Sequence, residues 1–485
     1  MSDPRPSAAG AAPSASVDRY AAALDRAHAI ALDYLASLPT RPVSRRLDPP
    51  AMTARLDAPL PETGCAPEDA IAEWFRRAEP GIVASPGPRF FGFVNGGVTP
   101  AALAGDWLAA AIDQNAFSWL NSPAAVSTED VVLRWLKELF GLPAEWAGAL
   151  TSGATMANLV GLAAARQWAA ERLGFDAARD GLAGQPPIPV ISTTEIHASA
   201  RKALATLGLG RARVITLPAP AGGAEPLALA EELARHEGPA IVIANAAEVN
   251  SGAFDPIAAI ADLCATHPAG AWLHVDAAFG LFAAASPRLR GLLSGIERAD
   301  SVAADGHKWL NVPYDSGFAF VRDAAALRAA FTVDAAYLAP DSDAPWDPFT
   351  HLPEMSRRFR ALAAWCALRA EGRAGYRAIV ERCVDNAAAF AGWVAAEPNL
   401  TLVAPAPLNI VCFRLDPEGV VGAERDALNR EAVVALQRDG RAFVSGTTWR
   451  GGAAIRAAFD NWSTTPDDVA ILQDAVRDVT RRLAG

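Results

Sequence analysis

Lys308 is the residue of this sequence whose type points most directly to covalent chemistry. The chain has 43 Lys and Arg residues, but its lysines are only Lys137, Lys202 and Lys308. Arginine serves ion pairing and solvation as well as lysine does, whereas forming an imine with an aldehyde needs a primary amine that can lose its proton. Lys308 is therefore the first candidate for a covalent catalyst, although a lysine taken at random is more often a surface cation.

A carboxylate precedes Lys308 at the end of an apolar run. Residues 271–280 read AWLHVDAAFG, so that Asp276 follows apolar residues and is followed by small ones. The pattern predicts a buried parallel strand that carries Asp276 at its C-terminal end, where ligands bind in open α/β sheets. A second short strand, 301–304, then delivers Lys308.

Two more segments could complete a site for a phosphorylated ligand. Gly153, Ala154 and Thr155 lie in a turn of small residues before an amphipathic helix, where backbone N–H groups can hold a phosphate. Such a turn is more often a plain helix cap. His197 lies between a β-like run and an alanine-rich helix, and a lone histidine is usually structural or exposed. Each motif alone is weak evidence for a functional site, and it is the order of all four along the sequence that supports one.

Together the four motifs resemble the site of the group II pyridoxal 5′-phosphate-dependent decarboxylases, the relatives of aromatic-L-amino-acid and glutamate decarboxylases. The resemblance runs from about Pro88 to at least Tyr376. It also includes residues 88–93 (PRFFGF), 114–119 (QNAFSW), 250–256 (NSGAFDP), 305–309 (DGHKW) and 356–360 (SRRFR). The resemblance implies pyridoxal 5′-phosphate (PLP) as cofactor and the α/β fold of the fold type I PLP-dependent transferases.

The resemblance also implies a role for each residue. Lys308 would form the Schiff base, Asp276 would pair with the pyridine nitrogen, and His197 would stack on the cofactor ring. The other expected cofactor contacts are Gly153, Ala154, Thr155, Ala278, Asp305 and His307.

The implied reaction is decarboxylation of an L-amino acid. The bond to the carboxylate would break when it lies perpendicular to the ring, and protonation of the resulting quinonoid would release an amine and CO2. Phe93, Phe117 and Trp119 offer an aromatic wall, which favours an aromatic substrate. Asn95, in the run VNGG, makes the expected pocket more open and polar than in aromatic-specific relatives.

The chain departs from the family pattern in one loop. Aromatic amino acid decarboxylases carry a tyrosine thought to return the proton to Cα, but residues 339–353 contain no tyrosine. His351 is the obvious proton donor there, and a solvated loop histidine is an equally good interpretation. Relatives without that tyrosine can divert the reaction to oxygen and form an aldehyde, so oxidative deamination is an alternative.

Other reactions of the same fold stay open. An aminotransferase or a lyase would keep the same cofactor residues, and Arg450 and Arg456 could bind a substrate carboxylate in a transaminase. A PLP-binding protein without turnover is the alternative that is not an enzyme. The intact set of Lys308, Asp276 and His197 argues against it.

Composition agrees with a soluble cytoplasmic enzyme. The net charge of −11 argues against nucleic acid or an anionic membrane surface as a partner. No stretch is long and apolar enough to span a bilayer. The five cysteines are an odd number without metal-type pairing, and we expect buried thiols in a reducing compartment.

The chain of 485 residues suits several domains. We expect a disordered tail over residues 1–16 and a helical segment over 17–87, which in relatives clasps the partner subunit and thus implies a homodimer with active sites at the subunit interface. β-like runs alternate with helices over residues 88–372, which predicts a mostly parallel sheet covered by helices. Residues 373–485 should form a small α+β domain.

Overall fold

The computed structural model describes residues 14–220, 222–333 and 346–484, and the structural statements below concern these residues. The α-helices are α1 (Ser14–Ser37), α2 (Pro49–Leu56), α3 (Pro67–Ala78), α4 (Pro100–Ile112), α5 (Pro123–Phe140), α6 (Ala154–Arg172), α7 (Ala177–Asp180), α8 (Ala198–Thr206), α9 (Pro226–Leu233), α10 (Ile257–Thr266), α11 (Ala324–Phe331), α12 (Ala361–Ala396), α13 (Gly422–Asp439) and α14 (Pro466–Ala484). The strands are β1 (Phe90–Phe91), β2 (Ala147–Thr151), β3 (Val190–Thr193), β4 (Ile215–Leu217), β5 (Ala240–Asn245), β6 (Ala271–Asp276), β7 (Ser301–Asp305), β8 (Gly317–Val321), β9 (Leu400–Leu402), β10 (Ile410–Leu415), β11 (Phe443–Trp449) and β12 (Gly452–Ala458).

A seven-stranded sheet forms the centre of the molecule. Its strand order is β2-β8-β7-β6-β5-β3-β4, and β8 alone in this sheet runs against its neighbours. The expectation of a mostly parallel sheet is therefore confirmed. The carboxyl ends of β2, β3, β5, β6 and β7 consequently lie along one edge.

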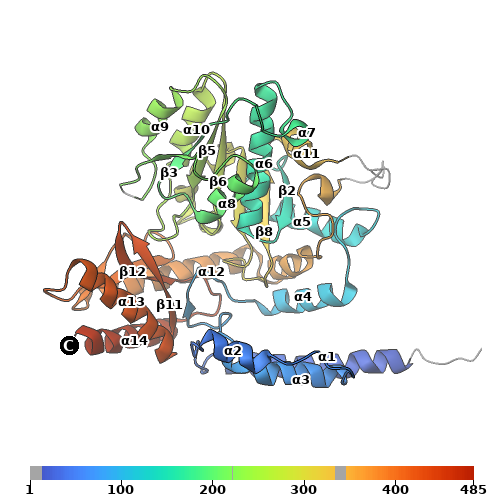
Figure 1. Ribbon diagram of the computed structural model, residues 1–485, viewed down its shortest axis with the longest axis vertical. Coiled ribbons are helices and arrows are strands. Elements are labelled where there is room, and N and C mark those ends of the chain that lie inside the picture. Colours follow the sequence, from blue (N-terminus) through green and yellow to red (C-terminus); the bar gives the residue numbers. More distant parts are fainter. Residues whose placement is uncertain (1–13, 221, 334–345, 485) are drawn as a thin grey trace, which may run out of the picture.

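Both faces of this sheet are buried, which explains why its strands are almost continuously apolar. In β5, Ile241 and Ile243 point to the core formed with α6 and α8. The alternate residues Val242 and Ala244 point to the opposite core, which includes α5, α10 and α12. Figure 1 shows the helices on the two sides of the sheet. This two-sided burial holds the strand ends in fixed positions.

A second sheet belongs to the C-terminal part of the chain. Its order is β1-β11-β12-β10-β9, and α13 packs against β10, β11 and β12. The short strand β1 pairs in parallel with β11, although it lies far earlier in the sequence. Helix α12 connects the two sheets and has a non-helical residue, Gly372, at φ 61°. The small α+β unit at residues 373–485 thus takes one strand from the N-terminal part.

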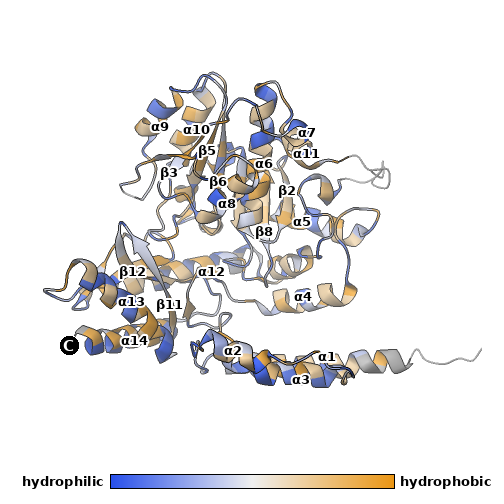
Figure 2. Ribbon diagram, viewed as in Figure 1, coloured by the Kyte–Doolittle hydropathy of each residue, from blue (hydrophilic) through white to orange (hydrophobic). Residues whose placement is uncertain are grey.

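Helices α1, α2 and α3 form an arm outside both sheets (Figure 1). α1 packs along α3, and α2 packs against α3. Figure 2 shows apolar and polar residues interspersed along α1 and α3, as expected for amphipathic helices. Of the tail expected to be disordered, residues 1–13 lie outside the described residues and residues 14–16 begin α1.

The strands expected in the large sheet are confirmed as β3, β5, β6, β7 and β8. The cysteine expectation is wrong for Cys65, which is exposed because it lies in the irregular segment between α2 and α3, whereas Cys264, Cys383 and Cys412 are buried. None of the helices in the described ranges has the length and apolar character needed to cross a membrane.

Candidate active site

A cavity of about 310 Å³ lies at the carboxyl edge of the large sheet. Three of the sequence motifs line it. The phosphate turn comes from the β2–α6 connection, the histidine from the β3–α8 connection and the lysine from the β7–β8 connection. Its lining residues are Ser152, Gly153, Ala154, Thr155, Met156, His197, Ser199, Ala278, Asp305, His307 and Lys308. Every cofactor contact expected from the sequence except Asp276 is among them.

Lys308 lies just beyond the end of β7, where its ammonium faces a carboxylate. Its Nζ is 3.0 Å from Asp305 Oδ2 and 5.5 Å from the centre of the Phe279 ring. Its carbonyl oxygen lies so close to Gly96 that an added Cβ there would be only 1.8 Å away. Gly96 also donates its backbone N–H to the carbonyl of His307. The backbone around Lys308 is thus fixed from two sides.

Asp305 also caps the helix that should hold a phosphate. Its Oδ1 accepts the backbone N–H of Ala154, at 2.5 Å, in the first turn of α6. The N–H groups of a first helical turn have no partner within the helix, and the helix dipole favours an anion there. The 19-residue α6 therefore directs its N-terminus into the cavity. Thr155, the second residue of α6, lines the same cavity.

Asp276 ends β6, just behind the cavity, with its side chain almost completely buried. Its Oδ1 accepts a hydrogen bond from the backbone N–H of Ala278, and its Oδ2 accepts one from Nδ2 of Asn158 at 2.9 Å. A buried carboxylate needs such donors, because burial without partners is costly. Ala278, whose N–H binds Asp276, itself lines the cavity, so Asp276 lies directly behind the cavity wall.

His197 stands at the N-terminus of α8 with its ring exposed to the cavity side. Its Nδ1 accepts the backbone N–H of Ser199, and the Ser199 hydroxyl lies 2.6 Å from the same nitrogen. Because a nitrogen that accepts an N–H carries no proton, the neutral ring has its proton on Nε2. The imidazole therefore presents an N–H donor away from α8.

His307 supplies an observation that fits a phosphorylated, aromatic cofactor. Its Nδ1 is buried and has no hydrogen-bond partner among the described residues, although His307 lines the cavity. Its ring stacks on Tyr314 at 4.4 Å. Burial, with a smaller contribution from the Lys308 charge, lowers the pKa of His307. A buried nitrogen without a partner needs one, and a phosphate oxygen would supply it.

Residues 93–94 connect β1 to the cavity in an unusual backbone conformation. Phe93 and Val94 have φ of 57° and 60°, a left-handed region that costs energy for side chains of this size. The Phe93 ring is 60% exposed and lies 6.1 Å from that of Phe443. Asn95 is half-buried. Neither Phe93 nor Asn95 lines the cavity within one chain.

Phe117 and Trp119 lie in a separate cluster. The Phe117 ring is 6.2 Å from that of Phe349, and the backbone N–H of Trp119 donates to Asp347 at 2.7 Å. Neither residue is among those that line the cavity. Within one chain, the aromatic wall expected from the sequence is therefore not brought to Lys308.

His351 is buried, and the cavity lining does not include it. Burial lowers its pKa to about 4, and its ring lies 5.1 Å from that of Trp346. The Thr350 hydroxyl donates to the carbonyl of Asp347, so at 2.8 Å it can only accept from Nδ1 of His351. The imidazole proton is thus already in use. Residues 339–345 of the loop without a tyrosine lie outside the described residues.

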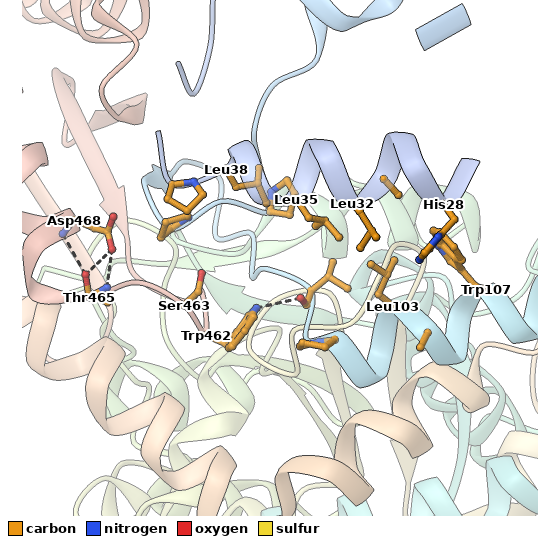
Figure 3. Close-up of a pocket in the computed structure, with 17 residues that line it drawn as sticks. His28, Leu32, Leu35, Leu38, Leu103, Trp107, Trp462, Ser463, Thr465 and Asp468 are labelled. Carbon is orange, nitrogen blue, oxygen red and sulfur yellow. Dashed lines mark hydrogen bonds between the residues drawn. The ribbon is translucent and has the colours of Figure 1, made fainter. Parts of the chain in front are cut away.

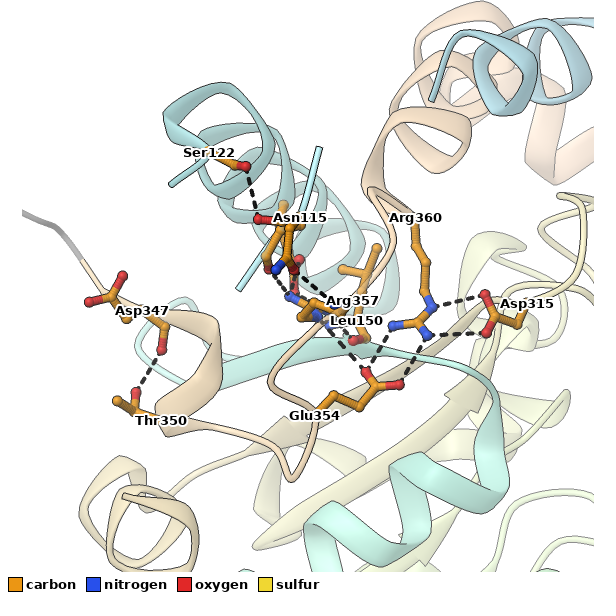
Figure 4. Close-up of polar contacts among 11 residues, drawn as sticks. Asn115, Ser122, Leu150, Asp315, Asp347, Thr350, Glu354, Arg357 and Arg360 are labelled. Atoms are coloured by element: carbon orange, nitrogen blue, oxygen red, sulfur yellow. Dashed lines mark hydrogen bonds and ion pairs between the residues drawn. The ribbon is translucent and has the colours of Figure 1, made fainter. Parts of the chain in front are cut away.

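The motif at residues 356–360 ties this loop to the site (Figure 4). Arg357 forms two hydrogen bonds to Glu129 and donates to the carbonyl of Leu150, in β2 just before the phosphate turn. Arg360 binds Asp315 and Glu354 at once, each through two hydrogen bonds. The sequence identified this motif by resemblance only. The structure shows that it joins the loop, β2 and the segment after Lys308.

The two arginines considered as carboxylate ligands are both engaged elsewhere. Arg450 is exposed and donates to the carbonyl of Pro220. Arg456 is buried in β12 and donates to the carbonyl of Val249 at 3.0 Å. Burial lowers the pKa of Arg456. Neither lines the cavity beside Lys308.

Sequence reasoning missed three polar residues of this region: Asn158, Ser199 and Asp460. Asn158 could have been noticed because it interrupts an otherwise apolar face of α6. Asp460 follows β12, is 1% exposed, and neither carboxylate oxygen has a partner among the described residues. Burial raises its pKa to about 7, against the attraction of Lys308 and Arg456. Nothing in the sequence marks it as buried.

A family model described as the pyridoxal-dependent decarboxylase conserved domain matches residues 49–416. Among curated proteins, tryptophan decarboxylase 1 of Oryza sativa subsp. japonica is 31% identical over 452 residues, which cover 88% of this chain and 87% of that protein. L-2,4-diaminobutyrate decarboxylase of Rhizobium meliloti (strain 1021) is 35% identical, covering 88% of this chain and 84% of that protein. Phenylacetaldehyde synthase of Arabidopsis thaliana is 28% identical and covers 88% of each chain.

The fold comparison agrees with the sequence comparison. A crystal structure of Oryza sativa TDC with PLP and tryptamine has a TM-score of 0.89 and 28% identity, and the alignment covers 100% of both chains. The expected fold type I architecture is thus confirmed.

Proposed function

This chain belongs to the family of pyridoxal-dependent decarboxylases and is a PLP-dependent amino acid decarboxylase, and from that premise we propose that it converts an aromatic L-amino acid to the amine and CO2. One observation carries the assignment of the site. Lys308, His197 and the N-terminus of α6 meet in one cavity at the carboxyl edge of the sheet. The similarity to tryptophan decarboxylase 1 supports an aromatic substrate.

Different residues of this chain would bind different parts of the cofactor. When bound, PLP supplies an electron sink for the bond that breaks at Cα. Lys308 would hold its aldehyde carbon, and Asp276 would face its pyridine nitrogen. Gly153, Ala154 and Thr155 would hold the phosphate with α6, while the Nε2–H of His197 is free to donate to the substrate side.

The positions of the arginines agree with loss of the carboxylate. A decarboxylase should not hold the leaving carboxylate in a strong ion pair, because that stabilises the charged ground state. Arg456 donates to a backbone carbonyl, and neither it nor Arg450 lines the cavity. A transaminase, which keeps the carboxylate, usually needs such an arginine there. This observation favours decarboxylation over transamination.

We propose that the protein works as a homodimer held by the N-terminal arm. A groove of about 850 Å³ runs between α1 and α4 and is lined mainly by apolar side chains, including Leu32, Leu103 and Trp107 (Figure 3). Leu32 is 53% exposed, and Leu108 and Ile112 on α4 are also exposed. Apolar surface of this kind on a monomer marks an interface, and α1 of a second copy matches it.

The separate aromatic cluster supports the same proposal. Phe117 and Trp119 lie away from the cavity of their own chain, next to residues 347–349. In a homodimer they would line the partner's cavity and complete its aromatic wall. Sedimentation at micromolar concentration should give the mass of two chains, and Leu32→Glu should weaken the dimer. Leu227→Glu, at a 73% exposed position on α9 outside both the arm and the groove, is the control. A wild-type protein that sediments as one chain would contradict the proposal.

Product analysis tests the reaction and the substrate. The purified, PLP-loaded protein is incubated in air with aromatic, acidic and basic L-amino acids, and products are identified by mass spectrometry. We expect amines one CO2 lighter than an aromatic parent. Amines only from acidic or basic substrates would reject the aromatic proposal, and keto acids would reject decarboxylation.

Oxidative deamination is the second candidate. It is favoured by the similarity to phenylacetaldehyde synthase. The absence of tyrosine from residues 339–353 gives it little support, because Tyr337 stands only two residues before them. In that reaction the amino acid, O2 and water give an aldehyde, CO2, ammonia and hydrogen peroxide. Among the residues that the structure describes, two are candidates for the proton donor that would prevent it. They are His351, predicted from the sequence, and Tyr314, whose ring stacks on His307.

We also propose a cytoplasmic location. The five cysteines are all unpaired, and three of them are buried, which suits a reducing compartment. Fractionation of the producing cell tests this directly.

A further inference from the structure

Asn158 lies at the junction of two residues that should face the cofactor. It is on α6, one helical turn after Ala154, and is completely buried. Its Nδ2 donates to Asp276 Oδ2 at 2.9 Å and to the Ser199 hydroxyl at 3.1 Å. Ser199 in turn lies 2.6 Å from Nδ1 of His197. One amide group therefore reaches both the carboxylate and the imidazole of the site.

The other side of Asn158 is anchored deep in the large sheet. Its Oδ1 lies 2.8 Å from Nε2 of His274, whose Nδ1 lies 2.8 Å from the Ser301 hydroxyl. The indole N–H of Trp272 donates to the same hydroxyl at 2.8 Å. All of these side chains are buried.

The groups at the two ends of this series of hydrogen bonds determine the direction of every hydrogen bond in it. Asp276 can only accept, so Asn158 turns Nδ2 to it and presents Oδ1, also an acceptor, to Nε2 of His274. At the other end an indole nitrogen can only donate, so Ser301 accepts from Trp272 and has its own proton available for Nδ1 of His274. His274 then carries its proton on Nε2 and donates to Asn158. Burial lowers the pKa of His274 to about 4, which agrees with a neutral ring.

The same logic continues to the cavity. With its oxygen occupied by His274, Asn158 must turn its two N–H groups toward Asp276 and Ser199. Ser199 accepts from Asn158 and donates to Nδ1 of His197. The proton of His197 is therefore left on Nε2, as its contact with the backbone of Ser199 also requires.

Space for this arrangement depends on a glycine. At Gly161, one turn after Asn158, an added Cβ would lie 2.8 Å from Nδ1 of His274 and 3.1 Å from the Ser301 hydroxyl. Helix α6 can thus approach β6 and β7 closely enough for Asn158 to reach His274. The close approach of Gly161 to both side chains is a second observation that supports the hydrogen-bond chain.

We propose that Asn158 is a positioning residue that orients Asp276 and fixes the tautomer of His197 through one polarised hydrogen-bond chain that begins at Trp272. The proposal rests on the proposed roles of Asp276 and His197 toward PLP. Asn158 itself need not touch the substrate. It acts by presenting donors to both groups, so that a carboxylate and an Nε2–H face the cofactor together.

Asn158→Asp tests the chain with little change in shape, because it replaces a donor by an acceptor that faces Asp276. Titration of the cofactor-free protein with PLP, followed by visible absorbance, should show affinity about 10- to 100-fold weaker, as expected for a lost hydrogen bond to a charged group. The pH at which the absorbance of the bound cofactor changes should also shift. Ser199→Ala, which cuts only the branch to His197, should keep PLP affinity within about 3-fold but alter the pH dependence of turnover.

Gln167→Ala is the matched control. Gln167 is another buried amide of α6, and it donates to Glu171 and Asp176, away from the cavity. Its loss should lower thermal stability without changing the PLP affinity or the absorbance titration. Equal losses of affinity in Asn158→Asp and Gln167→Ala would mean that Asn158 is merely structural, and wild-type affinity with an unchanged titration in Asn158→Asp would overturn the proposal.

Nuclear magnetic resonance of isotope-labelled histidine in the cofactor-free protein separates this proposal from the proposed function. We expect the Nε2–H tautomer for both His274 and His197 in the wild type. In Asn158→Asp we expect a smaller population of it at His197, where the backbone N–H of Ser199 is left as the donor to Nδ1. A proton on Nδ1 of His274 would overturn the chain whether or not PLP binds. Expected tautomers in a protein that gains no visible absorbance with PLP would instead overturn the proposed function.

Discussion

Arg357 and Glu129 form an ion pair that is closed to solvent, with Nη1 and Oε2 2.7 Å apart and side-chain exposures of 0% and 2%. Glu129 also accepts the backbone N–H of Leu150, so the pair fixes the strand that leads into the phosphate turn. Two buried charges gain little over apolar residues, but removing one leaves the other uncompensated.

Arg357→Ala should therefore lower the free energy of unfolding by about 3–5 kcal/mol. The neighbouring Arg358 pairs with Asp106 at a partly exposed position, with side-chain exposures of 39% and 22%, so Arg358→Ala should cost less than about 1 kcal/mol. Denaturant unfolding of both variants checks the difference. Similar costs for the two would show that the buried pair is not needed to hold β2.

Lys308→Arg should abolish the visible absorbance that develops when PLP is added, because a guanidinium does not form the imine. Turnover should fall to background. Lys202→Arg, at an exposed position on α8, should change neither property. Retention of a PLP imine by Lys308→Arg would assign the covalent role to another amine.

Gly96→Ala should disturb the site without removing any polar group. Its Cβ would lie 1.8 Å from the carbonyl oxygen of Lys308, and neither backbone can yield easily. We expect a loss of about 3 kcal/mol or more in unfolding free energy, or loss of PLP binding. Gly392→Ala, in α12 with open space around its Cβ, should instead stabilise by about 0.5–1 kcal/mol. Wild-type PLP affinity and stability in Gly96→Ala would refute this close approach.

Asp460 should make stability depend on pH in an unusual direction for a carboxyl group. Burial raises its pKa from 3.8 to about 7, so the folded state holds the proton more tightly than the unfolded chain. The stabilisation that comes from this tighter proton binding is complete below pH 3.8 and is lost as the pH rises to 7. The difference in the free energy of unfolding is up to about 4 kcal/mol. Asp460→Asn should raise the melting temperature at pH 8 and have little effect near pH 4. An equal effect at both values would show that Asp460 does not titrate in this range.

The ratio of amine to aldehyde should distinguish the two proton donors. The N–H of His351 is used by Thr350, so His351→Gln should change the ratio less than about twofold. Burial raises the pKa of Tyr314, which keeps its hydroxyl protonated, and Tyr314→Phe should increase the aldehyde fraction at least about tenfold. The opposite pattern would assign the proton to His351, as the sequence predicted.

The sequence allowed the large sheet and most of the cavity to be predicted because buried parallel strands are apolar and end in polar residues. Asp276 ends such a strand, and Lys308 and Gly153 follow two others within three residues. Asn158 and Asp460 were not predicted, because their significance arises from partners on other elements. The strand β1 was not predicted either, since two residues give no periodicity and its partner, β11, lies some 350 residues later. The position of Phe117 outside the cavity of its own chain was not predicted either, because it depends on the distant residue Phe349, whose ring lies 6.2 Å away.

The short path from β1 to Gly96 has a mechanical consequence. Phe91 belongs to the small sheet, whereas Gly96 lies against the carbonyl of Lys308, in the segment between β7 and β8 of the large sheet. Residues 92–95 are therefore a short joint between the two, in addition to the connection through α12. Phe93 and Val94, already in left-handed conformations, form that joint. A shift of the C-terminal unit would therefore act on the backbone of Lys308 through this short joint.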